Sequence, residues 1–133
     1  MSEALIWHCI RDHNSFLHKV GRTNRETEVQ FSAEPGNALA VNTFKYSGLA
    51  NHKATSLEAS GNGIVMKRKN AKSANKPVKA LSTIPIHAQK KRALKVINNL
   101  NLRKDLASAL SARYMRLHQA QYCKGSKPAS RRN

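Results

Sequence analysis

Positive charge is divided unevenly along this chain, and that division constrains its fold more than any other feature. Residues 1–66 hold six Lys and Arg side chains and six Asp and Glu side chains, so this half is neutral. Residues 67–133 hold the other 18 basic side chains and a single acid, Asp105, so the whole formal charge of +17 lies there. Self-repulsion on this scale opposes a compact free state and favours a polyanionic partner. We therefore predict a foldable neutral half followed by a half that binds phosphates.

The neutral half carries the signals of a small α+β domain, which we place at residues 1–69. Ser2 is a favourable N-cap residue, and the apolar residues that follow it recur on one side of a helix. We expect a short helix over about residues 3–12. Cys9 falls on its apolar stripe and is expected to be a small core residue. Trp7 lies off that stripe, so it either fills the core or stacks on a base.

Two hairpins are expected in the same half. Turn-forming residues at 21–25 separate two strand-like segments within residues 16–32, which predicts an antiparallel hairpin. The turn sequence Ser60-Gly61-Asn62-Gly63 separates two further segments within residues 55–69 and predicts a second hairpin. Residues 38–53 show no clean period, so we expect them to be mostly irregular.

The basic half is expected to contain a linker, two helices and a tail. Residues 70–84 combine lysines with small polar residues, which predicts an extended basic linker that is disordered when free. Residues 85–122 contain two amphipathic helical segments, at about 86–98 and 104–121. The tail, residues 123–133, is basic and expected to be loose. The predicted class is therefore α+β: a small antiparallel sheet of two hairpins with a short N-terminal helix, followed by the basic linker and two C-terminal helices.

Apolar and basic side chains separate onto opposite sides of the first predicted C-terminal helix. At 100° per residue, Ala93 and Ile97 share one face, and Lys91 and Lys95 lie on the other. The second helix has a similar apolar stripe of leucines, but Arg113 interrupts it, and the sequence offers no reason for that interruption.

The polyanion is expected to be RNA rather than DNA. The sequence has no helix-turn-helix spacing, zinc-finger pattern or zipper with a basic region. An extended basic linker and basic helices suit irregular folded RNA, which is recognised by shape and phosphate. Aromatic residues make up only 5% of the chain, so stacking is not expected to dominate binding. The residues of the basic half expected to contact RNA are Lys67, Arg68, Lys69, Lys72, Lys76, Lys79, Lys90, Lys91, Arg92, Lys95, Arg103, Lys104, Arg113 and Arg116.

Other classes of function are disfavoured. No run of eighteen apolar residues predicts a membrane span, and the N-terminus lacks the features of a secretory signal. Cys9-x3-His13 and His118-x4-Cys123 offer possible zinc ligands, but structural zinc sites prefer closer cysteine pairs, so no metal is expected. The known hydrolase, phosphate-loop and metalloprotease motifs are missing, so we expect no enzyme, no cofactor and no small-molecule substrate. Two cysteines in total indicate a reducing compartment.

Two motifs carry a resemblance to a known family. They are FSAEPGN at residues 31–37 and NTFKYSGL at residues 42–49, and further matching pieces lie at 15–17, at the Lys67-Arg68 strand exit and at 103–106. In order and spacing these pieces resemble the 28e family of eukaryotic large-subunit ribosomal proteins, over most of the chain.

The resemblance implies a small α+β domain followed by helices that lie on ribosomal RNA at the outer face of the large subunit. It implies no catalysis and no cofactor. Large-subunit rRNA and neighbouring ribosomal proteins would be the partners, in the cytoplasm after passage through the nucleus and nucleolus. It places Phe44 and Leu49 in the core. The residues of the motif region that it places toward rRNA are Asn42, Lys45, Tyr46, His52 and Lys53.

Two alternatives remain open at this point. The first is a nucleolar large-subunit assembly factor, because part of the domain also recurs in a nuclear biogenesis factor. That relative is cysteine-rich early and has an acidic C-terminal region, whereas this chain has Cys9 alone in its first half and a basic end. The second is a protein that binds a membrane surface or chromatin.

Overall fold

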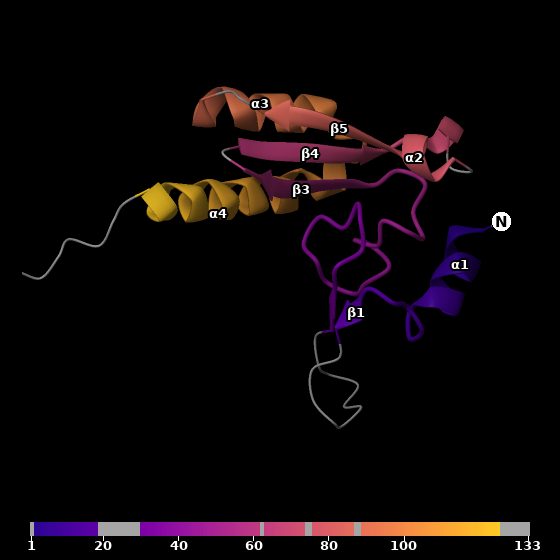
Figure 1. The fold of residues 1–133 in the computed structure, drawn as a ribbon. Coiled ribbons are helices and arrows are strands. Elements are labelled where there is room, and N and C mark those ends of the chain that lie inside the picture. The colour runs from indigo at the N-terminus through magenta and orange to yellow at the C-terminus, as the bar shows by residue number, and fades with distance from the viewer. Residues whose placement is uncertain (1, 19–29, 62, 74–75, 87–88, 126–133) are drawn as a thin grey trace, which may run out of the picture.

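The computed structural model describes residues 2–18, 30–61, 63–73, 76–86 and 89–125 (Figure 1). Its elements in chain order are α1 (Glu3–Ile10), β1 (Leu17–His18), β2 (Phe31–Ser32), β3 (Thr55–Ser60), β4 (Gly63–Lys69), the 3₁₀ turn η1 (Ala71–Ser73), α2 (Pro77–Ala80), β5 (Leu81–Ile86), α3 (Lys90–Leu100), the 3₁₀ turn η2 (Lys104–Leu106) and α4 (Ala107–Gly125). The predicted α+β class is confirmed.

A three-stranded antiparallel sheet in the order β3-β4-β5 forms the centre of the fold. Its first two strands are the hairpin expected from the turn at residues 60–63, where Gly61 adopts a φ of +51° that favours glycine. Met66 pairs with Leu57 on one side and with Ile84 on the other, so apolar side chains line up across one face. Alternation along β4 buries Ile64 and Met66 on that face.

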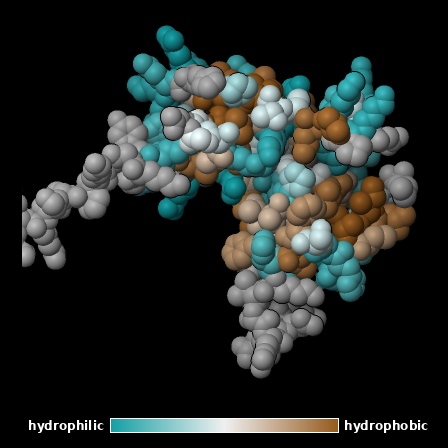
Figure 2. Space-filling model, viewed as in Figure 1, coloured by the Kyte–Doolittle hydropathy of each residue, from teal (hydrophilic) through white to brown (hydrophobic). Residues whose placement is uncertain are grey.

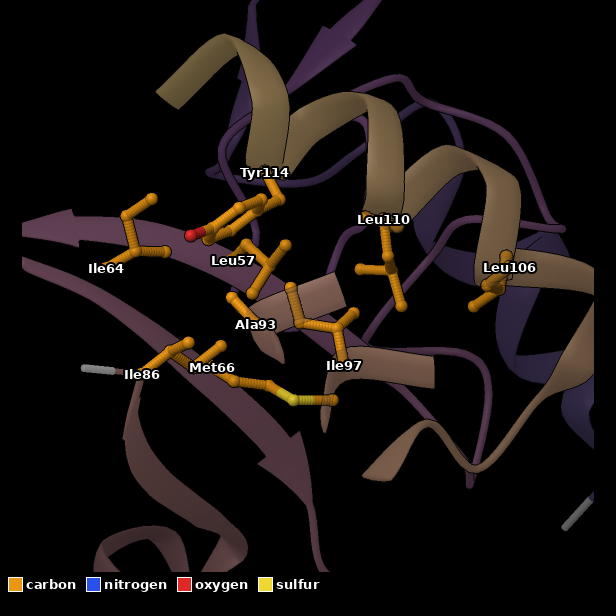
Figure 3. Close-up of a cluster of buried hydrophobic side chains, with 10 residues drawn as sticks. Leu57, Ile64, Met66, Ile86, Ala93, Ile97, Leu106, Leu110 and Tyr114 are labelled. Atoms are coloured by element: carbon orange, nitrogen blue, oxygen red, sulfur yellow. The ribbon is translucent and has the colours of Figure 1, made fainter. Parts of the chain in front are cut away.

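Helices α3 and α4 cover the apolar face of the sheet (Figures 1 and 3). Ala93 and Ile97 of α3 are fully buried, as the helical pattern predicted. Leu110 and Tyr114 of α4 are also buried and lie against the strands in the close-up of Figure 3. The core therefore joins the end of the neutral half to the basic half.

The segment expected to be an extended basic linker contains a strand instead. Residues 81–86 form β5, which pairs with β4 along its whole length. Ile84 and Ile86 alternate with Thr83 and Pro85, a period of two that the lysines upstream obscured. Proline is tolerated because β5 is an edge strand. The expected single sheet of two hairpins is thus a two-stranded and a three-stranded sheet, and the following helix begins at residue 90 rather than at 86.

Helix α1 is where the sequence pattern misleads about burial. None of its residues is buried, and Cys9 is exposed, so the expectation that Cys9 belongs to the core is wrong. The stripe contributes to no core because α1 lies apart from the sheet and its covering helices (Figure 1). Beyond it, Leu17 pairs with Ser32 in the small β1–β2 sheet, which confirms the first strand pairing. The expected turn at residues 21–25 lies outside the described residues.

Residues 38–53 are irregular, as predicted, and a buried polar network fixes their path. The carboxylate of Glu34 accepts hydrogen bonds from Asn37 Nδ2 at 2.9 Å and from Ser47 Oγ at 3.2 Å. Asn37 also donates to the carbonyl of Val41 and accepts from two backbone amides of the same segment. All three of these side chains are buried. They satisfy backbone groups that no helix or strand satisfies here.

Candidate nucleic-acid interface

The outer face of α3 carries four exposed cations. Lys90, Lys91, Arg92 and Lys95 are all exposed, whereas the opposite face of the helix packs on the sheet. The ion pairs among the described residues involve Arg11, Lys67 and Arg103, so none of them neutralises α3. A helix surface that is solvated for its own sake normally mixes charges of both signs. This face instead presents uncompensated positive charge.

Further exposed cations lie on other elements. Lys72, Lys76 and Lys79 lie on and around η1 and α2, and Lys104 and Arg116 lie on η2 and α4. Hydrophilic side chains project beside both α3 and α2 in Figure 2. The predicted cations of α2 and α3 are therefore exposed at the surface, where a polyanion can reach them.

Four other predicted cations are engaged within the protein, namely Lys67, Lys69, Arg103 and Arg113. Lys67 forms an ion pair with Glu58 at 2.6 Å across the β3–β4 hairpin. Arg103 binds both carboxylate oxygens of Asp105 and also donates to the backbone carbonyl of Lys45 at 3.1 Å. The hydrogen bonds from the Arg103 guanidinium are the main reason that the pKa of Asp105 is lowered from its ordinary value.

Arg113 resolves the interruption in the apolar stripe of α4. Its Nε donates to the backbone carbonyl of Leu57 at 3.1 Å, and the side chain is half-buried. Leu57 lies in β3, so this bond ties the long helix to the edge of the sheet. Arg113 therefore stands among the apolar residues of α4 because its guanidinium reaches a backbone carbonyl of β3.

Lys69 is committed to the fold rather than left for a ligand. Its ammonium donates to the backbone carbonyls of Gly48, Leu49 and Asn51 at 2.9, 3.0 and 2.9 Å. These three bonds use all the hydrogens that an ammonium carries. Burial lowers the pKa of Lys69, while the nearby carboxylate of Glu34 opposes that shift. The end of β4 is thereby fastened to the irregular segment.

The motif residues implied to face rRNA divide between structural and exposed positions. The side-chain amide of Asn42 donates to the carbonyl of Arg11 and to Gln30 Oε1, so it joins three segments of the neutral half. Tyr46 packs against the core, with the Lys45 ammonium 5.6 Å from its ring centre. Lys45, His52 and Lys53 are exposed.

The two motif residues implied to be core are not buried. Phe44 is 40% exposed and Leu49 is half-buried, so the expectation is wrong for Phe44 and only partly met for Leu49. The ring of Phe44 contacts Trp7 of α1, with ring centres 6.1 Å apart and a tilt of 46°. Trp7 is half-buried and fills no part of the sheet–helix core.

Sequence reasoning missed the residues that hold the motif in shape. Glu34, Asn37 and Ser47 were present in the two motifs, but polar residues beside Pro35 and Gly36 indicated only a turn. A signal was available, because an acid that is buried requires hydrogen-bond donors, and Asn37 and Ser47 lie in the same two motifs.

Within the described residues, no group of three or more His, Cys, Asp or Glu side chains is placed to hold a metal ion. None of the helices in the described part of the chain is long and apolar enough to cross a membrane.

Comparisons with known proteins give a consistent result. The model of the Ribosomal L28e protein family matches residues 5–120. The large ribosomal subunit protein eL28 of Caenorhabditis elegans is 43% identical over 62% of this chain and 61% of its own length. The protein of that name from Schizosaccharomyces pombe is 42% identical over 59% and 58%, and that from Dictyostelium discoideum 34% identical over 62% and 58%. The match spans about three fifths of each curated relative.

Proposed function

Because the chain belongs to the Ribosomal L28e protein family, we propose that it is a structural protein of the large ribosomal subunit that binds folded rRNA through exposed Lys and Arg side chains. The observation that carries this proposal is the outer face of α3, where four exposed cations have no acidic partner among the described residues. A family of ribosomal proteins also fits a binding role rather than an enzymatic one.

The mechanism is neutralisation of phosphate by cations held in fixed positions. Each Lys or Arg that contacts a phosphate releases condensed counterions, so affinity falls as salt rises. Four contacts from α3 alone give a slope of log K against log salt of about −3. The sheet positions α3 through the buried Ala93 and Ile97, so the cations meet the RNA as a set.

Apart from Arg68, which is half-buried, the predicted cations divide into two classes under this proposal. Exposed cations contact rRNA directly, and engaged cations hold the scaffold that presents them. The exposed class comprises Lys45, Lys53, Lys72, Lys76, Lys79, Lys90, Lys91, Arg92, Lys95, Lys104 and Arg116. Lys67, Lys69, Arg103 and Arg113 belong to the engaged class.

A charge-matched pair of double variants tests this division. Lys91→Gln with Lys95→Gln removes two unpaired cations, and Arg11→Gln with Lys67→Gln removes two cations held in ion pairs. We expect the first variant to lose large-rRNA affinity by about tenfold at moderate salt and to reduce the salt slope by about 2, because each lost phosphate contact reduces it by about 1. The second variant should bind nearly as the unmodified chain does. Equal losses in both would contradict the proposal, since total charge alone would then explain binding.

The same proposal places the protein in cytoplasmic ribosomes after assembly in the nucleolus. Tagged protein should co-sediment with large subunits and with translating polysomes through a high-salt wash. A nucleolar protein that is absent from polysomes would instead be the assembly factor. That outcome would retain rRNA binding but replace the structural role.

A further inference from the structure

Helix α1 and the loop beside it place two aromatic side chains outside the sheet–helix core, with Phe44 exposed and Trp7 half-buried. Phe44 is 40% exposed, Leu5 is 56% exposed, and no residue of α1 is buried. The ring centres of Trp7 and Phe44 lie 6.1 Å apart with a tilt of 46°, so the two rings are not stacked flat on each other. Figure 2 shows the apolar surface on this side of the molecule.

Polar contacts hold α1 in place at both ends. The carboxylate of Glu3 accepts from the backbone amide of His52 at 2.8 Å. At the other end, the side chain of Asn42 donates to the carbonyl of Arg11 at 2.9 Å. An isolated helix of eight residues is unstable in water, so these contacts supply what packing does not. They fix Trp7 against Phe44 without burying it, which lowers the entropy cost of binding a ligand there.

Cations border the aromatic pair. Lys45 follows Phe44 directly, and the side chain of Asn51 donates to the carbonyl of Phe44 at 2.7 Å, which brings the loop that carries Lys53 alongside. Lys45 and Lys53 are both exposed. The acid of α1, Glu3, is already bonded to the loop. Glu3 keeps its negative charge, because a backbone amide is neutral, so Lys45 and Lys53 together leave the surroundings of the rings with a net positive charge.

We propose that Trp7 and Phe44 form a stacking site for an unpaired base of RNA, with Lys45 and Lys53 contacting the adjacent phosphates. The inference rests on the proposed function and adds a ligand class for the neutral half. A base and its phosphates need both ring faces and cations, and this surface supplies both. In a duplex the base faces are covered by their neighbours, so the site selects single-stranded or looped RNA. An apolar protein segment would make no use of the bordering lysines.

Trp7 is the only tryptophan of the chain, so its emission reports on this site alone. The probes are a 12-nucleotide oligoadenylate and a 12-base-pair RNA duplex, titrated into the full chain at one salt concentration. We expect the single strand to quench Trp7 emission as a base stacks on the ring. The duplex should bind through the exposed cations of α3 without quenching.

Variants at Phe44 separate stacking from folding. Phe44→Leu keeps an apolar side chain but removes the ring face, and should weaken oligoadenylate binding by about tenfold, within the range measured for stacking on one aromatic side chain. Phe44→Tyr keeps the ring and should bind as the unmodified chain does. Phe16→Leu is the matched control, because Phe16 is 39% exposed in the same half. Duplex affinity should be the same for all four proteins.

Three outcomes would contradict these proposals, and each outcome contradicts a different part of them. Unchanged Trp7 emission, together with normal oligoadenylate affinity for Phe44→Leu, would overturn the stacking site while leaving the proposed function intact. Normal rRNA affinity but failed incorporation of Phe44→Leu into subunits would assign the surface to a neighbouring protein instead. Failure of the unmodified chain to bind either probe or rRNA would overturn the proposed function as well.

Discussion

Lys69 places its ammonium where three backbone carbonyls converge at the end of β4. Each bond is charge-assisted, and the side chain is half-buried. We expect Lys69→Met to lower the free energy of unfolding by about 2 kcal/mol, because the carbonyls lose their donor. Urea denaturation measures this. Lys53→Met, at an exposed position, should leave stability within about 0.5 kcal/mol.

In RNA binding, we expect the substitution of Lys53 to have the larger effect and that of Lys69 the smaller one. Lys53→Met should weaken binding and reduce its salt slope by about 1, whereas Lys69→Met should leave the slope unchanged in protein that remains folded. A stable Lys69→Met variant with a reduced slope would contradict the structural role of this ammonium.

Gly48 is placed where a side chain cannot fit. A Cβ atom there would lie 2.2 Å from the carbonyl oxygen of Pro35 and 2.8 Å from the backbone of Gly36. Both neighbours are backbone, so they cannot rotate away, and Gly48→Ala should cost about 3 kcal/mol or more of stability. Gly63→Ala is the control, since its nearest neighbour is 4.0 Å away. Similar thermal unfolding midpoints for the two variants would rule out the close approach of the two loops.

The first turn of α3 carries Lys90, Lys91 and Arg92, has no acid, and makes no side-chain cap bond. Cations at a helix N-terminus oppose the helix dipole, so the element is arranged for binding at some cost in stability. Lys90→Glu should raise the free energy of unfolding by about 0.5 kcal/mol and weaken rRNA binding. Lys95→Glu changes the charge equally in mid-helix, so it should weaken binding and relieve the general repulsion but gain nothing from the helix dipole. Equal stability of the two variants in urea denaturation would contradict this trade-off.

Packing of α4 on the sheet buries Tyr114, and this burial makes the stability of the fold depend on pH. Burial raises the pKa of Tyr114 above its ordinary value of 10.0. Above pH 10 the unfolded chain ionises at this residue while the folded chain keeps the proton, so stability falls as pH rises. Tyr114→Phe should lose less stability than the unmodified chain between pH 9 and pH 11 in urea denaturation. Parallel pH curves for the two proteins would show that Tyr114 ionises freely in the fold.

The elements differ in how well the sequence predicts them. The β3–β4 hairpin and helices α3 and α4 were predicted because turn glycines and helical apolar periods are local signals. Strand β5 was not, because its period of two spans only six residues beside a lysine-rich stretch. The buried state of Glu34 and the commitment of Lys69 depend on donors and acceptors brought together by the fold, and no local pattern records them. The types of side chain thus led to the prediction of a polyanionic partner, whereas the role of each interface residue depends on contacts that form only in the folded chain.

At the scale of the whole molecule, two cations of the charged half bind the neutral half and are therefore not available to a ligand. Lys69 and Arg103 both donate to backbone carbonyls of the irregular segment, at residues 45–51. These bonds draw two of the many positive charges inward against their mutual repulsion. The free protein therefore combines a scaffold fixed by these hydrogen bonds with a surface on which the remaining positive charges repel one another.

That self-repulsion predicts opposite responses of folding and binding to salt. With a net charge of +17, screening should stabilise the free protein, because the Debye length falls from about 30 Å at 0.01 M salt to about 10 Å at 0.1 M. We expect the thermal unfolding midpoint to rise by a few degrees over this range while rRNA affinity falls. Lys91→Gln with Lys95→Gln should raise the midpoint at low salt and flatten its salt dependence. Arg11→Gln with Lys67→Gln removes the same charge but also breaks two ion pairs, so it should raise the midpoint less. A midpoint that falls with added salt would mean that internal ion pairs outweigh repulsion, and the exposed cations would then be compensated after all.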